Sequence, residues 1–409
     1  MKSIPLALCA LVGHAAGTAA FAQSVTAAGN SQPQGARNTA RLCAPPLNQD
    51  PVQLTPLVMQ PTQQPIPFKG GDGHFHLAYE LTLENFSGDR VRADQVQVLD
   101  ARDGAQLARL DAAMIASRLV VRDRQAVAGE FGASQLGILY LHVTFDAPGA
   151  IPPTISHRLT MTSKDQTVVA TAACSGVARP TQLLLDAPLH GARYIAGDGC
   201  CDSTRHVRAT LPLNGTAFDA QRFAIDWEQL DTRDRIYVGD PKQPNSYVIY
   251  GKPVYAVADA RVIAAVDGMA DSPIGALPNL PPDRADGNHV ILDLGNGRFA
   301  LYAHFKPHSV QVTEGQEVRR GQLLGLVGTT GNSSEPHLHF QVTDGPSALM
   351  ANGVPYLLRK FRATRRGAST AAYDKATMDG KPMETVPLAG PSEHEQELPL
   401  DLWITDLPE

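Results

Sequence analysis

The sequence predicts a mainly β protein, with an N-terminal β-sandwich followed by an antiparallel β domain built as a compact barrel or stacked sheets. Two patterns predict this fold class. Between residues 51 and 176, short runs of alternating apolar and polar residues recur with turn residues between them. Between residues 177 and 362, apolar runs of six to eight residues are separated by glycines. A chain of 409 residues, 43% hydrophobic and 19% charged, is long enough for two or three cores of this kind.

The chain begins with a segment typical of secretory signal peptides. Lys2 precedes an apolar run that ends in Ala20-Phe21-Ala22, a small-residue cleavage pattern. This run is too short to cross a membrane, and no later segment has eighteen uninterrupted apolar residues. We therefore expect residues 1–22 to be a signal peptide and the protein to be exported, to the periplasm or the cell exterior, without a membrane span. Residues 23–50 are polar and rich in Pro, Gly and Asn, which predicts a linker.

The first β-rich region, residues 51–176, contains four long alternating runs. They are HLAYELTLENF, VRADQVQVLDA, LGILYLHVTFDA and HRLTMTSKDQTVVATAACSG. Such alternation is typical of strands that place one face in a core and the other in solvent. The turn residues between the runs favour a β-sandwich. We expect an accessory domain that positions the second domain, shields its groove or binds a partner, and the fold alone does not choose among these roles.

The second β-rich region, residues 177–362, repeats Gly-punctuated strands such as GKPVYAVADARVIAAVDG and GNHVILDLGNGRFALYAHF. Residues 269–286 interrupt this pattern, because they are rich in Pro and Asp and have no periodicity. They predict a surface loop beside a groove. After Lys381 the chain carries seven acidic residues and no Lys or Arg. We therefore expect residues 363–409 to form a flexible acidic tail.

Four cysteines follow the signal peptide, an even number that predicts disulfides in an exported protein. Cys43 and Cys174 bracket the first β-rich region, so one bridge could join them. Cys200 and Cys201 could instead each pair with one of those two, and the spacing does not decide. A zinc site built on cysteines is disfavoured because the sequence has no C-x-x-C spacing.

The charge balance bears on the class of partner. The formal net charge is −6 at pH 7, and the composition is ordinary for a globular protein. Proteins that bind nucleic acid rely on a basic surface. We therefore expect no nucleic-acid partner.

The stretch Glu335-Pro336-His337-Leu338-His339-Phe340 places two histidines on one edge of an apolar strand. Because side chains alternate along a strand, His337 and His339 face one side while Leu338 and Phe340 face the other. Two imidazoles aimed into one space suggest a metal site, but an H-x-H pair alone is also found among surface and core histidines.

The wider context of this pair resembles the lysostaphin/LytM-type family of peptidoglycan metalloendopeptidases. The resemblance covers residues 222–342 and consists of several ordered motifs. The G-x-P-V-x-A strand of the family stands at residues 251–256, its Y-x-H strand at 302–304, and its H-L-H-F ending at 337–340. The resemblance implies a duplicated hybrid motif, a barrel-sandwich of antiparallel strands, and a Zn²⁺ cofactor.

The resemblance also implies roles for individual residues. Asp226, in RFAIDW, matches the carboxylate ligand of the family, and His339 matches its imidazole ligand. His304 and His337 match the two histidines that act without binding the metal. We assign His304 as the base that takes a proton from water and His337 as the stabiliser of developing charge, although these roles could be exchanged. Tyr302 is a candidate substrate-binding residue, as a donor to the oxyanion or an aromatic lining the groove.

One metal-ligand position departs from the family pattern. Four residues before Asp226 the family has a histidine, and this chain has Arg222, whose guanidinium has no free lone pair for a metal. An ion pair between Arg222 and Asp226 could replace the metal. Alternatively, another side chain supplies the third ligand. His206, upstream in STRHVRATLPLNG, is the candidate we favour, and Glu228 and Asp231 are weaker ones.

Two functions follow from the resemblance. The first is a secreted zinc metalloendopeptidase that hydrolyses peptide bonds in the cross-links or stem peptides of peptidoglycan, supported by the retained His304 and His337. The second is a catalytically degenerate homologue that binds cell wall or activates a separate amidase. Arg222 supports this second function, as does Glu335, which stands where the family more often has Gly.

Overall fold

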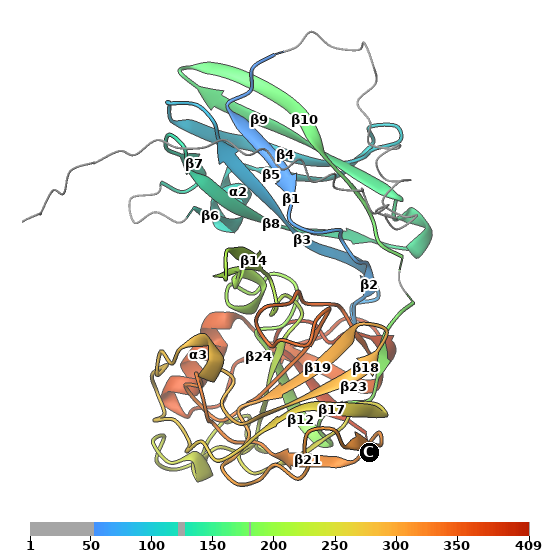
Figure 1. The fold of residues 1–409 in the computed structure, drawn as a ribbon, viewed down its shortest axis with the longest axis vertical. Helices are drawn as coiled ribbons and strands as arrows, with labels where there is room; N and C mark the ends of the chain where they lie inside the picture. Colours follow the sequence, from blue (N-terminus) through green and yellow to red (C-terminus); the bar gives the residue numbers. More distant parts are fainter. Residues whose placement is uncertain (1–52, 122–126, 180, 409) are drawn as a thin grey trace, which may run out of the picture.

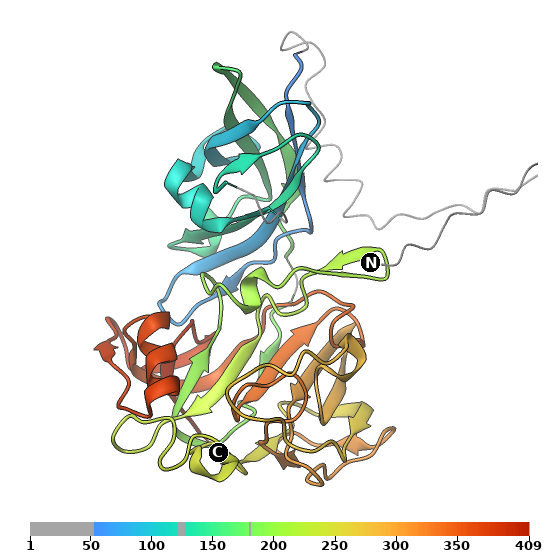
Figure 2. The ribbon, with the colours of Figure 1, turned by 90° about the vertical axis from the view of Figure 1, so that its left-hand side faces the viewer.

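The computed structural model describes residues 53–121, 127–179 and 181–408. They form two β-rich parts stacked along the long axis of the molecule, as both views show (Figures 1 and 2). The predicted signal peptide and linker, residues 1–50, lie outside the described residues. Within the described residues, no helix is long and apolar enough to span a membrane. The predicted mainly β fold is confirmed.

The N-terminal part consists of two five-stranded antiparallel sheets whose facing side chains share one core. Leu81 and Leu139 from one sheet and Val96 and Leu159 from the other are all fully buried in it. The first sheet has the order β1-β3-β8-β6, with β2 beside β3, and the second has the order β10-β9-β4-β5, with β7 beside β4. The bounds are β1 (Leu57–Pro61), β2 (Phe68–Lys69), β3 (Phe75–Asn85), β4 (Val91–Asp100), β5 (Gln106–Asp111), α2 (Ala112–Arg118), β6 (Leu119–Val121), β7 (Glu130–Phe131), β8 (Leu136–Phe145), η1 (Pro148–Ala150), β9 (Thr154–Ser163) and β10 (Gln166–Gly176).

The C-terminal part is built on a twelve-stranded sheet with the order β11-β23-β26-β12-β15-β22-β19-β18-β17-β20, with β24 and β25 beside β23. Two small hairpin-like sheets, β13-β14 and β16-β21, complete it. The bounds up to residue 343 are β11 (Leu184–Leu185), β12 (Gly191–Gly197), η2 (His206–Arg208), β13 (Leu211–Leu213), β14 (Thr216–Phe218), β15 (Ile225–Gln229), η3 (Pro244–Ser246), β16 (Pro253–Tyr255), β17 (Ala260–Val266), η4 (Pro282–Arg284), β18 (His289–Gly295), β19 (Arg298–Ala303), β20 (Glu317–Val318), β21 (Leu323–Leu326) and β22 (Leu338–Thr343).

The expected flexible tail is wrong, because residues 363–408 are an integral part of this sheet. They contain the end of β23 (Leu357–Gly367), α3 (Thr370–Asp379), β24 (Thr385–Pro387), β25 (Glu393–Glu397) and β26 (Trp403–Leu407). Strand β26 lies between β23 and β12, with Trp403 and Leu407 in the core. The acidic residues of β25 face basic ones of β23, at 3.7 Å for Glu395 with Lys360. Three of the acidic residues therefore belong to a strand that pairs with a basic one. The acidic composition gave no sign of the apolar residues that β26 buries in the core.

The cysteine pairing also differs from one of the two expected arrangements. Cys200 and Cys201 form a disulfide with each other, so neither pairs with Cys43 or Cys174. Cys174 is disulfide-bonded as well. Cys43, the partner that the sequence suggests for it, lies outside the described residues.

Candidate metal centre

Two neighbouring strands in the middle of the large sheet bring Asp226 and His339 together. Asp226 of β15 is the register partner of His339 of β22, and Nδ1 of His339 lies 2.8 Å from Oδ1 of Asp226. Alternation along β22 sends Leu338 and Phe340 into the hydrophobic core, where both are fully buried. It leaves His339 on the opposite face. On the other side of β22, the register partner of His339 is Ala303, whose small side chain leaves room beside the imidazole.

His206 reaches the same place from the short helix η2, which lies twenty residues earlier in the chain than Asp226. Its Nε2 atom is 3.3 Å from Oδ2 of Asp226, and its ring meets the His339 ring edge-on with centroids 4.9 Å apart. The three candidate ligand atoms of His206, Asp226 and His339 all lie within 4.8 Å of one another. The structure thus brings together the three residues that the sequence analysis named as a ligand set.

Gln341 orients the imidazole of His339, a role that was not predicted from the sequence. The side-chain amide of Gln341 donates from Nε2 to the carbonyl of Ala348 at 2.7 Å, which turns its Oε1 toward His339 Nε2 at 2.9 Å. Because an amide oxygen only accepts, Nε2 of His339 carries a hydrogen, and Nδ1, which faces the Asp226 carboxylate, is the ring nitrogen available to a cation held between the two side chains. A signal was present in the sequence, because Gln341 follows His339 by two residues and therefore shares its strand face.

His304 and His337 lie beside this group, with ring centroids 4.7 Å apart. Nδ1–H of His304 donates to the Thr330 carbonyl at 2.7 Å, and Nδ1–H of His337 donates to the Glu335 carbonyl at 2.8 Å. Carbonyls only accept, so in the neutral form each ring has its lone pair on Nε2. Nε2 of His337 points to Oδ1 of Asp226 at 3.5 Å.

The charges of the group follow from burial and from Asp226. Burial raises the pKa of the Asp226 carboxyl, but the imidazoles of His206, His337 and His339 outweigh it and hold that pKa well below its usual range. Burial lowers the pKa of His206, and the Asp226 carboxylate then raises it to about 9. Burial lowers the pKa of His304 well below its usual value, and the neighbouring imidazoles lower it further. His304 is therefore neutral at physiological pH.

The donor set fits a zinc ion. One carboxylate and two imidazoles with an open fourth position is a ligand type that catalytic zinc sites use. Oxygen and imidazole nitrogen donors also suit other divalent first-row metals, with zinc among the tighter binders.

Tyr302 is not part of the site, in contrast to its expected role as a substrate-binding residue. Its side chain is fully buried, its hydroxyl accepts the backbone N–H of Val257 at 2.9 Å, and its ring packs edge-on against Phe340. Tyr302 and His304 would share a face in a regular strand. However, β19 ends at Ala303, and His304 has a left-handed φ of 66°, which turns its side chain away from the core.

Arg222 lies in the turn that precedes β15, outside the strand that carries Asp226. Its Nε donates to Oε1 of Glu80, in strand β3 of the N-terminal part, at 2.6 Å, and its guanidinium lies 3.3 Å from the Asp219 carboxylate. The alternative in which Arg222 replaces the metal by pairing with Asp226 is therefore wrong. Sequence offered no signal for Glu80, which is 142 positions away.

The two weaker ligand candidates have other partners. Glu228 is buried and accepts the hydroxyl of Tyr373 at 2.8 Å. Asp231 lies in a turn and accepts the guanidinium of Arg235 at 2.9 Å. Neither belongs to the group of ligand atoms around Asp226.

Contacts with the N-terminal part hold the segment that carries His206. Asp202, upstream of His206, pairs with Arg118 at the end of α2 at 2.7 Å. Downstream, the hydroxyl of Tyr140 in β8 lies 2.7 Å from the hydroxyl of Thr210. The segment is thus fixed on both sides of the imidazole. These contacts join residues 84 and 70 positions apart, so the sequence pattern carried no signal for them.

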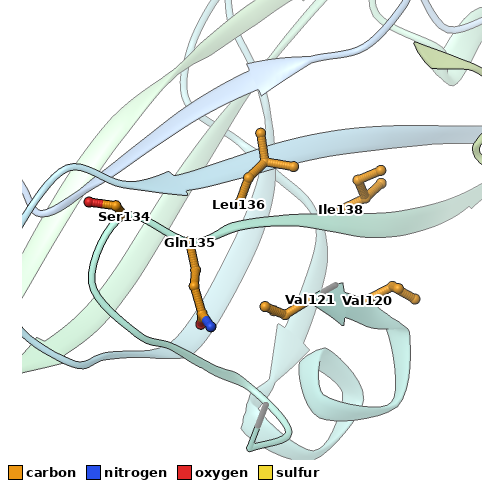
Figure 3. Close-up of a pocket in the computed structure, with 6 residues that line it drawn as sticks. All are labelled: Val120, Val121, Ser134, Gln135, Leu136 and Ile138. Atoms are coloured by element: carbon orange, nitrogen blue, oxygen red, sulfur yellow. The ribbon is translucent and has the colours of Figure 1, made fainter. Parts of the chain in front are cut away.

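A hollow elsewhere on the molecule is formed by β6, the start of β8 and the loop that precedes β8 (Figure 3). It is lined by Val120, Val121, Ser134, Gln135, Leu136 and Ile138. None of these side chains ionises at ordinary pH. The hollow therefore supplies neither a metal ligand nor an acid–base group, and the candidate chemistry stays with the histidines of the large sheet.

Comparison with known proteins finds a family profile that covers three of these histidines. Residues 247–351, which contain His304, His337 and His339, match the profile of peptidase family M23. A 56-residue segment is 41% identical to peptidoglycan DD-endopeptidase ShyA of Vibrio cholerae and covers 14% of this chain and 13% of that protein. A 55-residue segment is 46% identical to DD-carboxypeptidase/endopeptidase Mpg of Neisseria meningitidis and covers 13% of this chain and 12% of that protein.

Among solved structures, the catalytic domain of lysostaphin from Staphylococcus simulans is 22% identical and covers 37% of this chain and 80% of that chain, with a TM-score of 0.21. The chain spans only about an eighth of the length of the two curated relatives named above. Residues 247–351 are thus similar to peptidase family M23, in agreement with the lysostaphin/LytM-type motifs of the sequence.

Proposed function

We propose that the protein is an exported zinc metalloendopeptidase that hydrolyses peptide bonds in the cross-links or stem peptides of peptidoglycan. The observation that carries this proposal is the convergence of His206, Asp226 and His339 within 4.8 Å, with His304 and His337 beside them. The relatives support the substrate class, because those named above are peptidoglycan DD-endopeptidase and DD-carboxypeptidase/endopeptidase. The apolar run of residues 1–22 supports export.

His206, Asp226 and His339 would hold the zinc ion, through two imidazoles and one carboxylate. When bound there, zinc supplies a Lewis acid that polarises a carbonyl and lowers the pKa of water toward about 7. The chain prepares this ligand set by burying the two histidines and leaving Asp226 partly exposed. It also orients His339 through Gln341, so that its Nδ1 atom points into the site toward Asp226.

His304 would act as the general base. Its Nδ1–H is held by the Thr330 carbonyl, so Nε2 is free to take a proton from water, and burial keeps the ring neutral at physiological pH. His337 would act on developing charge. Its Nδ1–H is held by the Glu335 carbonyl, and Nε2 can carry a proton toward an oxyanion or a leaving amine.

The sequence suggested a degenerate, binding-only homologue mainly because of Arg222. The contacts of Arg222 weaken that argument. The guanidinium is occupied by Glu80, and His206 stands where a third ligand is needed. If the protein does not hydrolyse peptidoglycan, the alternative function is favoured, in which it binds cell wall or activates an amidase without catalysis.

The test is digestion of purified peptidoglycan by the full chain, with released muropeptides separated and identified by mass. We expect cross-linked dimers to fall and cleaved stem peptides to appear, and a chelator to stop both. His304→Ala should lower the rate by about 100- to 10,000-fold while zinc stays bound, because it removes the base and leaves the ligands. His308→Ala, at an exposed loop residue, is the matched control. Peptidoglycan that the zinc-loaded protein binds and leaves uncut would contradict the proposal and favour the binding role.

A further inference from the structure

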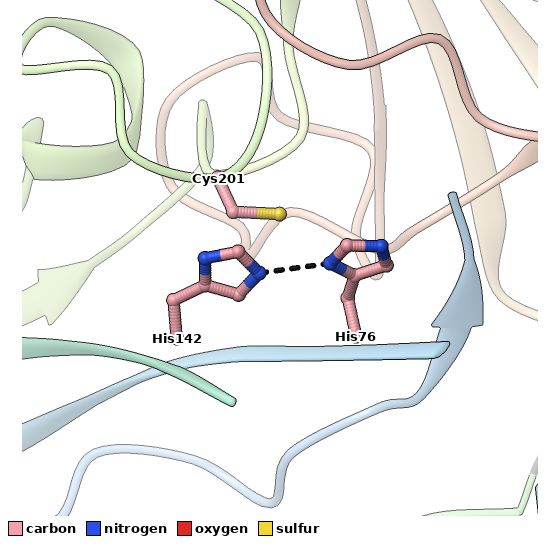
Figure 4. A group of neighbouring side chains, drawn as sticks. All are labelled: His76, His142 and Cys201. Atoms are coloured by element: carbon pink, nitrogen blue, oxygen red, sulfur yellow. Dashed lines mark hydrogen bonds between the residues drawn. The ribbon is translucent and has the colours of Figure 1, made fainter. Parts of the chain in front are cut away.

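A second group of metal-binding side chains lies at the junction of the two β-rich parts, away from the site described above. His76 of β3 and His142 of β8 come from adjacent paired strands, and Cys201 approaches them from the loop after β12 (Figure 4). One ligand atom from each lies within 4.8 Å of the others. His76 and Cys201 are buried, with 1% and 7% of their surface exposed.

The hydrogen bonds of the two imidazoles leave two lone pairs facing each other. Nε2 of His76 lies 2.9 Å from the Asp72 carboxylate, and Nδ1 of His142 lies 3.2 Å from the Asp202 carboxylate. Carboxylates only accept, so these outer nitrogens carry the hydrogens. The inner nitrogens, Nδ1 of His76 and Nε2 of His142, are 2.8 Å apart. In neutral rings both present lone pairs there, which requires a proton or a cation between them.

A carboxylate contacts the outer nitrogen of each imidazole, as is common for histidines that bind a metal. A ligating histidine generally donates its other ring N–H to a carboxylate or carbonyl, which sets its tautomer and orientation. Asp72 and Asp202 serve the two rings in this way.

The sulfur of Cys201 determines which cations the group can bind, and its redox state determines when they can bind. Its sulfur is bonded to Cys200, and a disulfide sulfur is a far weaker ligand than a thiolate. Two imidazoles and one thiolate form a set that suits Zn²⁺ and copper, whereas Mg²⁺ and Ca²⁺ prefer oxygen ligands.

We propose that His76, His142 and Cys201 form a second metal site, for a cation that takes imidazole and thiolate ligands such as Zn²⁺, and that reduction of the Cys200–Cys201 disulfide opens it. A dithiol reductant gives two electrons and two protons, the S–S bond breaks, and the reductant closes to its own disulfide. Cys200 and Cys201 become thiols, and binding of the cation releases the proton of Cys201. The bound cation then ties β3 and β8 to the loop that leads to His206.

A pair of serine variants of the full chain tests this site without any reductant. Cys200→Ser leaves Cys201 as a free thiol, and Cys201→Ser leaves Cys200 as the free thiol. With Co²⁺ as the probe, Cys200→Ser should show the near-ultraviolet sulfur-to-cobalt charge-transfer band and Cys201→Ser should not. Under Zn²⁺, Cys200→Ser should bind one more equivalent per chain than Cys201→Ser. The centre around Asp226 has nitrogen and oxygen donors, so it cannot give the sulfur band whatever its own occupancy.

Wild-type protein gives the redox arm of the same test. The sulfur-to-cobalt band should appear after treatment with a dithiol and disappear on reoxidation. His142→Ala, placed in the Cys200→Ser chain, should lose the band while circular dichroism shows the fold retained. The proposal is overturned if Cys200→Ser binds no additional metal, or if the band persists in Cys201→Ser or without His142.

Discussion

Arg222 and Glu80 form a buried ion pair that joins the turn before β15 to strand β3 of the N-terminal part. Their side chains are 5% and 1% exposed, and Nε of Arg222 lies 2.6 Å from Oε1 of Glu80. The pair removes a positive charge from the neighbourhood of Asp226. It also makes the two β-rich parts dependent on each other, because either charge alone would be buried without its main partner.

Removing one member of this pair should destabilise the protein strongly. Glu80→Gln leaves the guanidinium of Arg222 buried with only Asp219 as an acidic partner, so we expect a loss of about 3 kcal/mol in the free energy of unfolding. Urea denaturation measures it. Glu84→Gln, the same change at a partly exposed carboxylate of the same strand, should cost less than about 0.5 kcal/mol. Equal losses for the two variants would show that the pair has no such role.

Gln341 should tune the metal centre without binding the metal. Gln341→Ala removes the acceptor that holds Nε2–H of His339, so zinc affinity should fall by about 10- to 100-fold. Gln341→Glu keeps an oxygen acceptor at that position and should recover most of the affinity. Competition with a chromophoric chelator gives both values. An unchanged affinity in Gln341→Ala would mean that His339 is oriented by its packing alone.

His157 should make the N-terminal sheets sensitive to acid. It is fully buried between the Tyr79 hydroxyl and the Ala173 carbonyl, and burial lowers its pKa from 6.5 to about 4. A lowered histidine pKa stabilises the fold above the unfolded value of 6.5, and this contribution is lost as pH falls toward 4. The loss amounts to about 3 kcal/mol by linkage.

The measurement is the pH dependence of unfolding in wild type and His157→Gln. The variant lacks the titrating group, so the two curves should converge between pH 6.5 and 4. His74→Gln, at an exposed histidine, should run parallel to wild type. Parallel curves for wild type and His157→Gln would contradict the assignment of the acid sensitivity to this residue.

The local part of the site could be predicted from the sequence because it depends on strand alternation. His337, His339 and the apolar residues between and after them follow the two-residue period, and β22 places Leu338 and Phe340 in the core accordingly. The same rule failed one strand away. A single left-handed residue, His304, breaks the period after β19, so Tyr302 enters the core while His304 enters the site.

The rest of the site depends on contacts between distant segments, which no local pattern records. The closeness of His206 to Asp226 requires a loop held by Arg118 and Tyr140 of the N-terminal part. Arg222 turns away because Glu80 offers a buried carboxylate. The prediction of a flexible tail at residues 363–409 failed for a different reason. It was based on the acidic composition and did not take into account apolar residues such as Trp403, which is buried.

The most direct test of the zinc centre is the zinc affinity of the full chain and of His206→Ala, with His308→Ala as the exposed-histidine control. If His206 is the third ligand, wild type and His308→Ala should bind zinc equally tightly, and His206→Ala should bind it at least 100-fold more weakly, equivalent to about 2.7 kcal/mol. An affinity that is the same in all three proteins would contradict the assignment of His206 as the third ligand.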